Sequence, residues 1–192
     1  MQIAVLLLDQ FADWEAAYLS SGLRLFGHDV MVRSPEGAPV RSLGGFAVQP
    51  DGRLDGPADF DGLALIGGTS WRTSAALAVE PLVRRTLREN KVLGAICDAA
   101  GFLGTLGVLN GVRHTCNDLA DLRQWAGERY GGEACFLPRP AVRDGTLVTA
   151  NGTAALEFAR EFLLALDAAP EVDILRWYQF HKLGYAAPLP GM

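Results

Sequence analysis

The sequence predicts a doubly wound α/β fold, in which helices cover both faces of a mostly parallel sheet. Short runs of almost entirely apolar residues recur along the first half of the chain, as parallel strands buried on both faces require. Segments with the apolar spacing of helices alternate with these runs. One run, Val92 to Ile96, passes through Cys97 into small residues and then into a helical pattern.

The first half of the chain is predicted to alternate strands and helices. Gln2 to Leu8 is a continuous apolar run and reads as a central strand. Asp13 to Phe26 has helical spacing, and Gly27 ends it. The remaining predicted elements are a strand over Asp29 to Ser34, a small hairpin or excursion over Gly37 to Pro50, a strand over Gly62 to Ile66, a helix over Glu80 to Asn90, the strand Val92 to Ile96 and a helix over Gly101 to Gly107.

The second half is less regular. Its predicted elements are a short strand over Arg113 to Asn117, a helix over Leu119 to Tyr130, a hairpin over Val142 to Val148 with Asp144-Gly145 in a primed turn, an amphipathic helix over Ala154 to Leu166 and an aromatic-rich helix over Val172 to His181. The tail from Pro188 to Met192 is expected to be loose. Because no repeat, linker or low-complexity segment interrupts the pattern, residues 1–192 are predicted to form one domain, with residues 170–192 as its C-terminal helix and tail.

Composition excludes several classes of function. The chain has 192 residues, 49% of them hydrophobic and 20% charged, which is ordinary for a soluble globular protein. A net charge of −5 without a basic cluster argues against nucleic acid as a partner. The apolar start is too short for a membrane span and lacks a basic leader, so no membrane partner is expected.

Cysteine usage bears on location and on metals. The three cysteines are widely spaced, which makes a disulfide framework unlikely and fits a reducing cytoplasm. Neither C-x-x-C nor H-E-x-x-H spacing occurs, so we expect no metal site and no cofactor.

Cys97 is the candidate reactive residue. A strand that turns sharply into a helix is a nucleophile elbow, and the small residues Ala99, Ala100 and Gly101 tolerate such a turn. The unpaired N–H groups of the helix N-terminus would favour a thiolate. The alternative is an inert cysteine buried at a strand end, and the residues alone leave both open.

Glu15 is the candidate partner of Cys97. In a doubly wound sheet, the loops that follow strand ends Leu8, Ile66 and Ile96 share one rim. A carboxyl group in the first helical turn could reach across this rim and, when protonated, donate a hydrogen bond to the thiolate and lower its pKa. The alternative is a glutamate that only stabilises the helix dipole.

Gly67 and Gly68 are candidates for an oxyanion hole. Glycines after a strand let backbone N–H groups approach a ligand, and with the N–H of Asp98 they could bind the oxygen of an attacked carbonyl. The alternative is a simple turn. Because no Gly-Lys-Ser/Thr follows, the pair is not a phosphate-binding P-loop.

A catalytic cysteine usually needs a base, and the chain has three histidines. His114 is the accessory candidate, although a structural role fits it better. His28 reads as a loop residue, and His181 as a helix end where a cation is favourable.

Several segments in the same order carry a family resemblance. They are Leu8 to Glu15, Ile66-Gly67-Gly68, Ala95-Ile96-Cys97-Asp98-Ala99, Gly107-Val108-Leu109-Asn110-Gly111 and Val148 to Ala154. From Ile3 to about Asp167 the chain resembles the ThiJ/PfpI superfamily, whose fold is flavodoxin-like and of the class I glutamine amidotransferase type. It is also similar to small uncharacterised bacterial members that open with D-Q-(F/Y)-A-D-W-E.

The resemblance implies roles for the candidate residues. Cys97 would be the elbow thiolate, and Glu15 would hydrogen bond to it and lower its pKa. Backbone N–H groups near Gly68 and Asp98 would form an anion pocket. The resemblance further implies a homodimer with the site near the subunit interface.

One departure from the family narrows the predicted chemistry. The pattern R-x-T-(T/C)-H falls on Arg113 to Asn117, which puts Asn117 where the family has a histidine beside the cysteine. We therefore do not expect peptidase activity, although Asn117 could orient a substrate or water. A cysteine-dependent hydrolase or lyase acting on a small carbonyl or amide (glyoxalase-, hydratase- or amidase-like) remains. The alternative is a redox or stress-response protein with an oxidisable, low-pKa Cys97.

Overall fold

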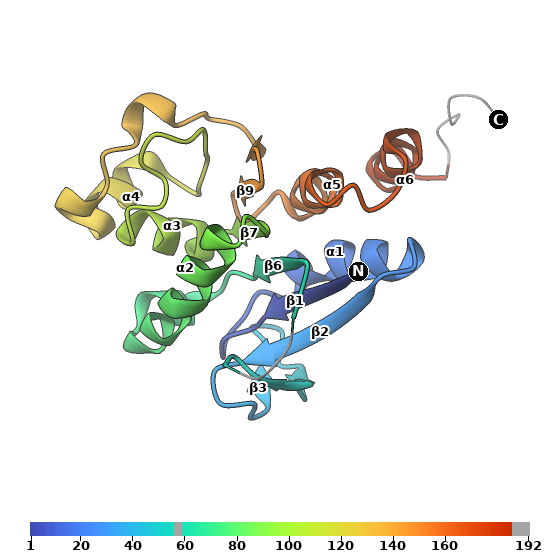
Figure 1. The fold of residues 1–192 in the computed structure, drawn as a ribbon, viewed down its shortest axis with the longest axis horizontal. Coiled ribbons are helices and arrows are strands. Elements are labelled where there is room, and N and C mark those ends of the chain that lie inside the picture. The colour runs from blue at the N-terminus through green and yellow to red at the C-terminus, as the bar shows by residue number, and fades with distance from the viewer. Residues whose placement is uncertain (56–58, 186–192) are drawn as a thin grey trace.

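A seven-stranded sheet organises the part of the chain that the computed structural model describes, residues 1–55 and 59–185 (Figure 1). The strand order is β5-β2-β1-β6-β7-β9-β8, and every neighbouring pair is parallel except β8 with β9. The strands are β1 Gln2–Leu6, β2 Asp29–Ser34, β5 Gly52–Arg53, β6 Gly62–Leu65, β7 Val92–Ile96, β8 Ala141–Asp144 and β9 Leu147–Ala150. A separate small hairpin pairs β3 (Val40–Arg41) with β4 (Ala47–Val48). The predicted fold class is confirmed.

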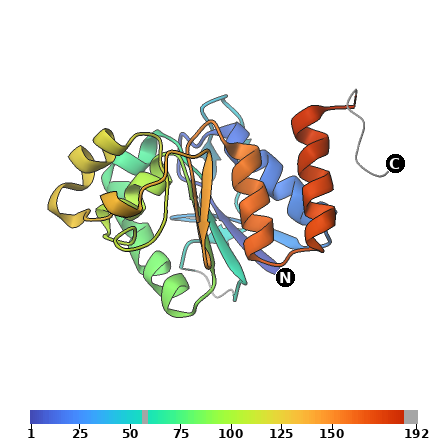
Figure 2. The same ribbon diagram turned by 90° about the horizontal axis from the view of Figure 1, so that it is seen from above.

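Helices lie on both faces of the sheet (Figure 2). One face carries α1 (Asp13–Leu25), α5 (Ala155–Ala165) and α6 (Glu171–Leu183), which pack on one another. The other carries α2 (Glu80–Arg88) and α3 (Asp98–Thr105), with α4 (Leu119–Ala126) packed on α3. Short 3₁₀ turns complete the set: η1 Thr69–Arg72, η2 Ser74–Val79, η3 Gly127–Arg129 and η4 Glu133–Cys135.

The core is divided in two by the sheet. In β1, Ile3 and Val5 belong to the cluster under α1 and α5, whereas Ala4 and Leu6 belong to the cluster under α2 and α3. All four are buried because alternate side chains point to opposite, covered faces. The continuous apolar run of the first strand therefore follows from burial on both faces.

Two expected elements differ in the structure. Helix α3 begins at Asp98, three residues before the predicted start, because the turn at Cys97 leads directly into it. The strand predicted over residues 113–117 is absent, and only a single bridge joins His114 to Phe136. His114 makes backbone hydrogen bonds to Cys135 and Leu137, and the next N–H, that of Thr115, donates to the side chain of Thr149, with Oγ1 at 2.9 Å.

The other predicted elements are present with bounds shifted by a few residues at most, apart from the predicted helix over Leu119 to Tyr130, which is divided between α4 and η3. The hairpin turn is formed by Gly145 and Thr146, one residue later than predicted, because Asp144 pairs with Leu147 in the ladder. The loose tail predicted over residues 188–192 lies outside the described residues. Within the described ranges, no helix has the length and apolar character needed to cross a membrane.

Candidate active site

Cys97 sits in a sharp turn between β7 and α3. Its backbone has φ +61° and ψ −132°, a conformation that costs a residue with a side chain roughly 1–3 kcal/mol. The turn is held on both sides, because the Cys97 N–H donates to Ala150 O at 3.0 Å and the Cys97 carbonyl accepts from Ala100 N–H at 3.0 Å. The thiol is half-buried and lies at the N-terminus of α3.

Glu15 faces Cys97 from the first turn of α1. Its side chain is fully buried, and Oε2 accepts a hydrogen bond from Gly67 N–H at 2.8 Å. Oε1 has no hydrogen-bond partner among the described residues. A methyl group added at Gly152 would lie 2.9 Å from Cys97 Sγ and 3.1 Å from Glu15 Oε1. The thiol and the unpartnered carboxyl oxygen therefore both lie next to Gly152.

The two groups titrate as a pair. Burial raises the pKa of Glu15 to about 7. Burial, followed by the charge of an ionised Glu15, raises the pKa of Cys97 to about 11. This direction is opposite to the lowered thiol pKa that the family resemblance implied. From about pH 7 to about pH 11 the pair holds one proton and one negative charge, and the thiolate is the form in which Glu15 keeps that proton.

The two glycines differ in what their N–H groups can bind: that of Gly67 binds Glu15, and that of Gly68 could bind a ligand. Gly67 donates its N–H to Glu15, so that N–H is not available to an oxyanion. Gly68 has φ +142° and packs against the Gln10 carbonyl, which only glycine allows. Its N–H makes no hydrogen bond to another described residue. The Asp98 N–H is directed at Cys97 Sγ.

Asn117 contacts the thiol directly. Its Nδ2 donates to Cys97 Sγ at 3.3 Å, and its Oδ1 accepts from Gly152 N–H at 2.8 Å. The amide thus stands beside the cysteine, where the family pattern has a histidine. It can stabilise negative charge on sulfur, but a carboxamide cannot serve as a base.

His114 is not brought to the site. It is completely buried, with Nδ1 at 2.7 Å from Val112 O and Nε2 at 2.7 Å from the Tyr130 hydroxyl. Burial lowers its pKa. His28 forms a hydrogen bond with the carbonyl of Ala168, and His181 forms one with the carbonyl of Trp177. Among the described residues, no imidazole therefore hydrogen bonds to Cys97.

Arg72 belongs to the site, although no role in the site was predicted for it from the sequence. Its Nε donates to Asp98 Oδ2 at 2.8 Å, and its guanidinium also binds Asp121 at 3.1 Å and lies 4.5 Å from the centre of the Trp125 ring. The only signal was its place just after the Gly67 to Trp71 loop. Nothing in the sequence pairs it with an aspartate 26 positions away.

The space beside the thiol is small. A cavity of about 10 Å³, room for about one water molecule, is lined by Cys97, Asn117 and Arg72 among others. A larger cavity of about 400 Å³ adjoins it through Asn117 and is also lined by Phe136 and Asn151. In the described ranges, no cluster of three or more histidine, cysteine or acidic residues could hold a metal ion.

The fold and the site together define a doubly wound α/β protein with a cysteine and a buried glutamate at the carboxyl edge of its sheet. The family model described as the DJ-1/PfpI family matches residues 1–165. The chain belongs to the DJ-1/PfpI family, as the resemblance in its sequence implied.

Named relatives agree with this assignment. The chain is 35% identical to the uncharacterised protease YdeA of Bacillus subtilis over 182 residues, 94% of this chain and 90% of that protein. It is 30% identical to the deglycase PfpI of Pyrococcus furiosus over 118 residues, 60% of this chain and 71% of that protein. A crystal structure of a DJ-1 superfamily protein from Agrobacterium tumefaciens matches with a TM-score of 0.86 and 39% identity, covering 95% of this chain and 98% of that one.

Proposed function

We propose that this protein is a cysteine-dependent enzyme that acts on a small carbonyl or amide substrate, with Cys97 as the nucleophile. The observation that carries the proposal is the shared space between Cys97 Sγ and the unpartnered Oε1 of a buried Glu15. The small cavity at the thiol favours a small reacting group, and the adjoining cavity offers room for the rest of a substrate. Two of the relatives carry the names protease and deglycase, which are in line with an enzyme of this class.

Glu15 is the proposed proton-transfer group. A carboxyl group with a pKa of about 7, raised by burial, can give and take a proton near neutral pH. In the proposed step, the Cys97 sulfur adds to the carbonyl carbon, the C=O electron pair moves to oxygen, and Glu15 donates its proton to that oxygen. The N–H groups of Gly68 and Asp98 and the Asn117 amide are the candidate donors to the developing charge.

This arrangement favours carbonyl addition over peptide hydrolysis. Peptide hydrolysis requires a proton to be delivered to the leaving amine, and Asn117 stands where a histidine would deliver it. Addition to a reactive dicarbonyl needs only the thiolate and one acid–base group, so a glyoxalase- or hydratase-like reaction is the form we favour.

The test is turnover of small dicarbonyls, amides and isonitriles by the wild type and by Cys97→Ala. Cys135→Ala is the matched control, because Cys135 is also half-buried but does not line the cavity at Cys97. We expect Cys97→Ala to abolish turnover and Cys135→Ala to preserve it. Equal turnover by wild type and Cys97→Ala for every active substrate would refute the proposal.

The Cys–Glu pair is tested by the pH dependence of Cys97 alkylation with iodoacetamide. We expect the wild-type rate to rise as the pair loses its first proton near pH 7, because the thiolate form then becomes populated. In Glu15→Gln this rise should move to higher pH. An unchanged profile would remove Glu15 from the mechanism.

A second candidate function is a redox sensor. The unpartnered Glu15 Oε1 beside Sγ could donate a hydrogen bond to the oxygen atoms that peroxide adds to sulfur. This function predicts site-selective sulfinate formation at Cys97, measured by mass spectrometry, in a protein without turnover.

The homodimer implied by the family resemblance stays a prediction, which light scattering in solution tests.

A further inference from the structure

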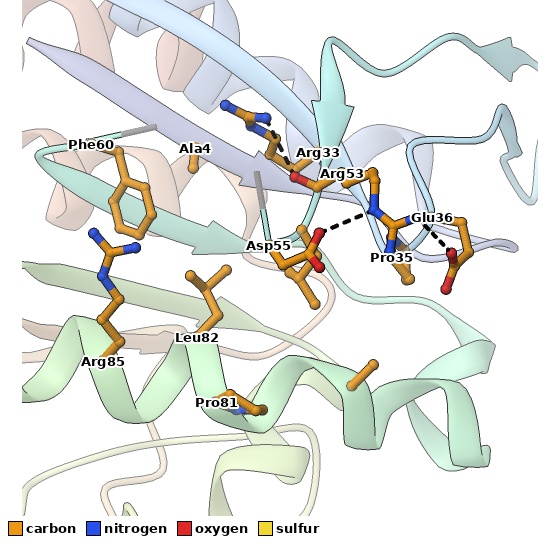
Figure 3. Close-up of a pocket in the computed structure, with 12 residues that line it drawn as sticks. Ala4, Arg33, Pro35, Glu36, Arg53, Asp55, Phe60, Pro81, Leu82 and Arg85 are labelled. Carbon is orange, nitrogen blue, oxygen red and sulfur yellow. Dashed lines mark hydrogen bonds and ion pairs between the residues drawn. The ribbon is translucent and has the colours of Figure 1, made fainter. Parts of the chain in front are cut away.

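A separate cavity of about 460 Å³ lies between α2 and the β2–β5 edge of the sheet (Figure 3). It shares no lining residue with the cavity at Cys97. Arg33 lies on one side of it, and Leu82 and Pro81 of α2 lie on the opposite side. The proposed reaction at Cys97 uses none of these residues, so the cavity is unexplained by that function.

Arg33 is the unusual residue of this cavity. It is half-buried, and its guanidinium donates only to Arg53 O at 3.3 Å and to Met31 Sδ at 3.7 Å. No carboxylate pairs with it in the described ranges, whereas every other half-buried arginine there has one. Those other arginines are Arg84, Arg85 and Arg160. A partly desolvated guanidinium with unused N–H groups is a site for an anion.

The remaining walls limit the anion to a single charge. The cavity lining holds three arginines, and the two acidic residues Glu36 and Asp55 both bind Arg53 at 3.1 Å. Arg85 is paired with Glu89 at 2.8 Å, so Arg33 is the one arginine of the lining without a carboxylate partner among the described residues. The two carboxylates would repel a doubly charged phosphate more strongly than a monoanion, whose single charge matches that of Arg33.

The opposite wall selects an apolar body. Phe60 is 6% exposed, and its ring, with Leu82 and Pro81, faces the cavity. The Arg85 guanidinium carbon lies 6.0 Å from the centre of the Phe60 ring and already has Glu89 as a partner at 2.8 Å. The cavity therefore has one charged end at Arg33 and an apolar side against α2. Its volume is within the range of sites for small ligands.

We propose that this cavity binds a small monocarboxylate with an apolar body, of the medium-chain aliphatic or aryl acid class. The carboxylate binds the Arg33 guanidinium, whose planar fork matches its two oxygens. The apolar body lies between Phe60 and Leu82 and is removed from water there. This site is independent of Cys97, so its test can fail without affecting the proposed enzyme activity, and the reverse also holds.

The test is calorimetric titration of the full chain with octanoate near neutral pH, with 1-octanol as the neutral probe. We expect octanoate to bind the wild type and Arg33→Gln to bind it at least about tenfold more weakly, because a charge-assisted pair is lost. Arg88→Gln is the matched control, since Arg88 is an exposed arginine of α2 without a carboxylate partner among the described residues and does not line the cavity. It should bind octanoate like the wild type.

A second variant tests the cavity without touching Arg33. Ala78 lines the cavity, so Ala78→Trp should fill it and abolish octanoate binding. Circular dichroism would show that each variant is folded. No octanoate binding by the wild type at millimolar concentrations, equal affinity in Arg33→Gln, or equally tight binding of 1-octanol would each overturn the proposal.

Discussion

At the scale of single residues, the buried carboxyl group of Glu15 couples folding to pH. Its pKa is raised from 4.5 to about 7, chiefly by burial, so the folded state binds the proton more tightly than the unfolded state does. The resulting stability is fully present below pH 4.5 and is lost as pH rises through about 7. Gln retains an oxygen for the Gly67 N–H and carries no charge.

We therefore expect Glu15→Gln to change the pH profile of stability. Between pH 5 and pH 8 the wild type should lose up to about 3 kcal/mol of unfolding free energy relative to the variant. Urea denaturation at both pH values measures this difference. Parallel profiles would show that the carboxyl group is ionised in the folded protein across the whole range.

Asn117 makes a second residue-scale prediction. Asn117→Asp keeps an oxygen for the Gly152 N–H but replaces the donor to Cys97 Sγ with a negative charge. We expect the thiol pKa to rise and alkylation at neutral pH to slow by roughly tenfold, the effect of one pKa unit. Asn110→Asp is the control, because Asn110 likewise accepts from a glycine N–H, that of Gly131, but lies outside the cavity at the thiol. Equal slowing in both variants would contradict a direct role.

At the scale of elements, the sequence was most informative where buried strands end. The apolar runs placed the loops after β1, β6 and β7 on one edge, and the structure brings Glu15, Gly67 and Cys97 together there. The prediction of a strand over residues 113–117 was wrong. Alternating side chains in a short segment do not show whether a neighbouring strand exists to pair with it. The side-chain bond from Thr115 N–H to Thr149 depends on tertiary contacts that local pattern does not encode.

Arg72 links η1 to α3 and α4, and this link should tune the thiol. The Asp98 carboxylate raises the pKa of both Cys97 and Glu15, and Arg72 opposes that charge. In Arg72→Gln the uncompensated Asp98 should slow alkylation of Cys97 at neutral pH by about two- to fivefold, a modest effect because the pair is partly exposed. Adding Asp98→Asn should restore the rate. A double variant as slow as Arg72→Gln would mean that Arg72 acts through packing on Trp125 and not through charge.

At the scale of the whole molecule, Glu15 is the site residue to which we assign an effect on stability, and we expect the packing of outlying elements such as α6 to be separable from the chemistry of the site. Composition and periodicity predicted the layered fold because the apolar pattern recurs in the central strands β1, β6 and β7. The raised pKa of the Cys97 thiol could not be predicted, since it depends on how deeply Cys97 and Glu15 are buried. The free guanidinium of Arg33 was equally hidden, because pairing of arginines is decided by contacts between distant segments.

Helix α6, which lies beyond the segment matched by the family model, tests this separation. Its Trp177 is 8% exposed and packs against α1, where a methyl group at Gly22 would lie 3.2 Å from the ring. Trp177→Ala should lower the unfolding free energy by roughly 3–5 kcal/mol, whereas Val172→Ala at an exposed position should stay within about 0.5 kcal/mol. Below its unfolding transition, Trp177→Ala should keep the wild-type pH profile of Cys97 alkylation. A shifted profile in the folded variant would show that α6 supports the site through α1, the helix that carries Glu15.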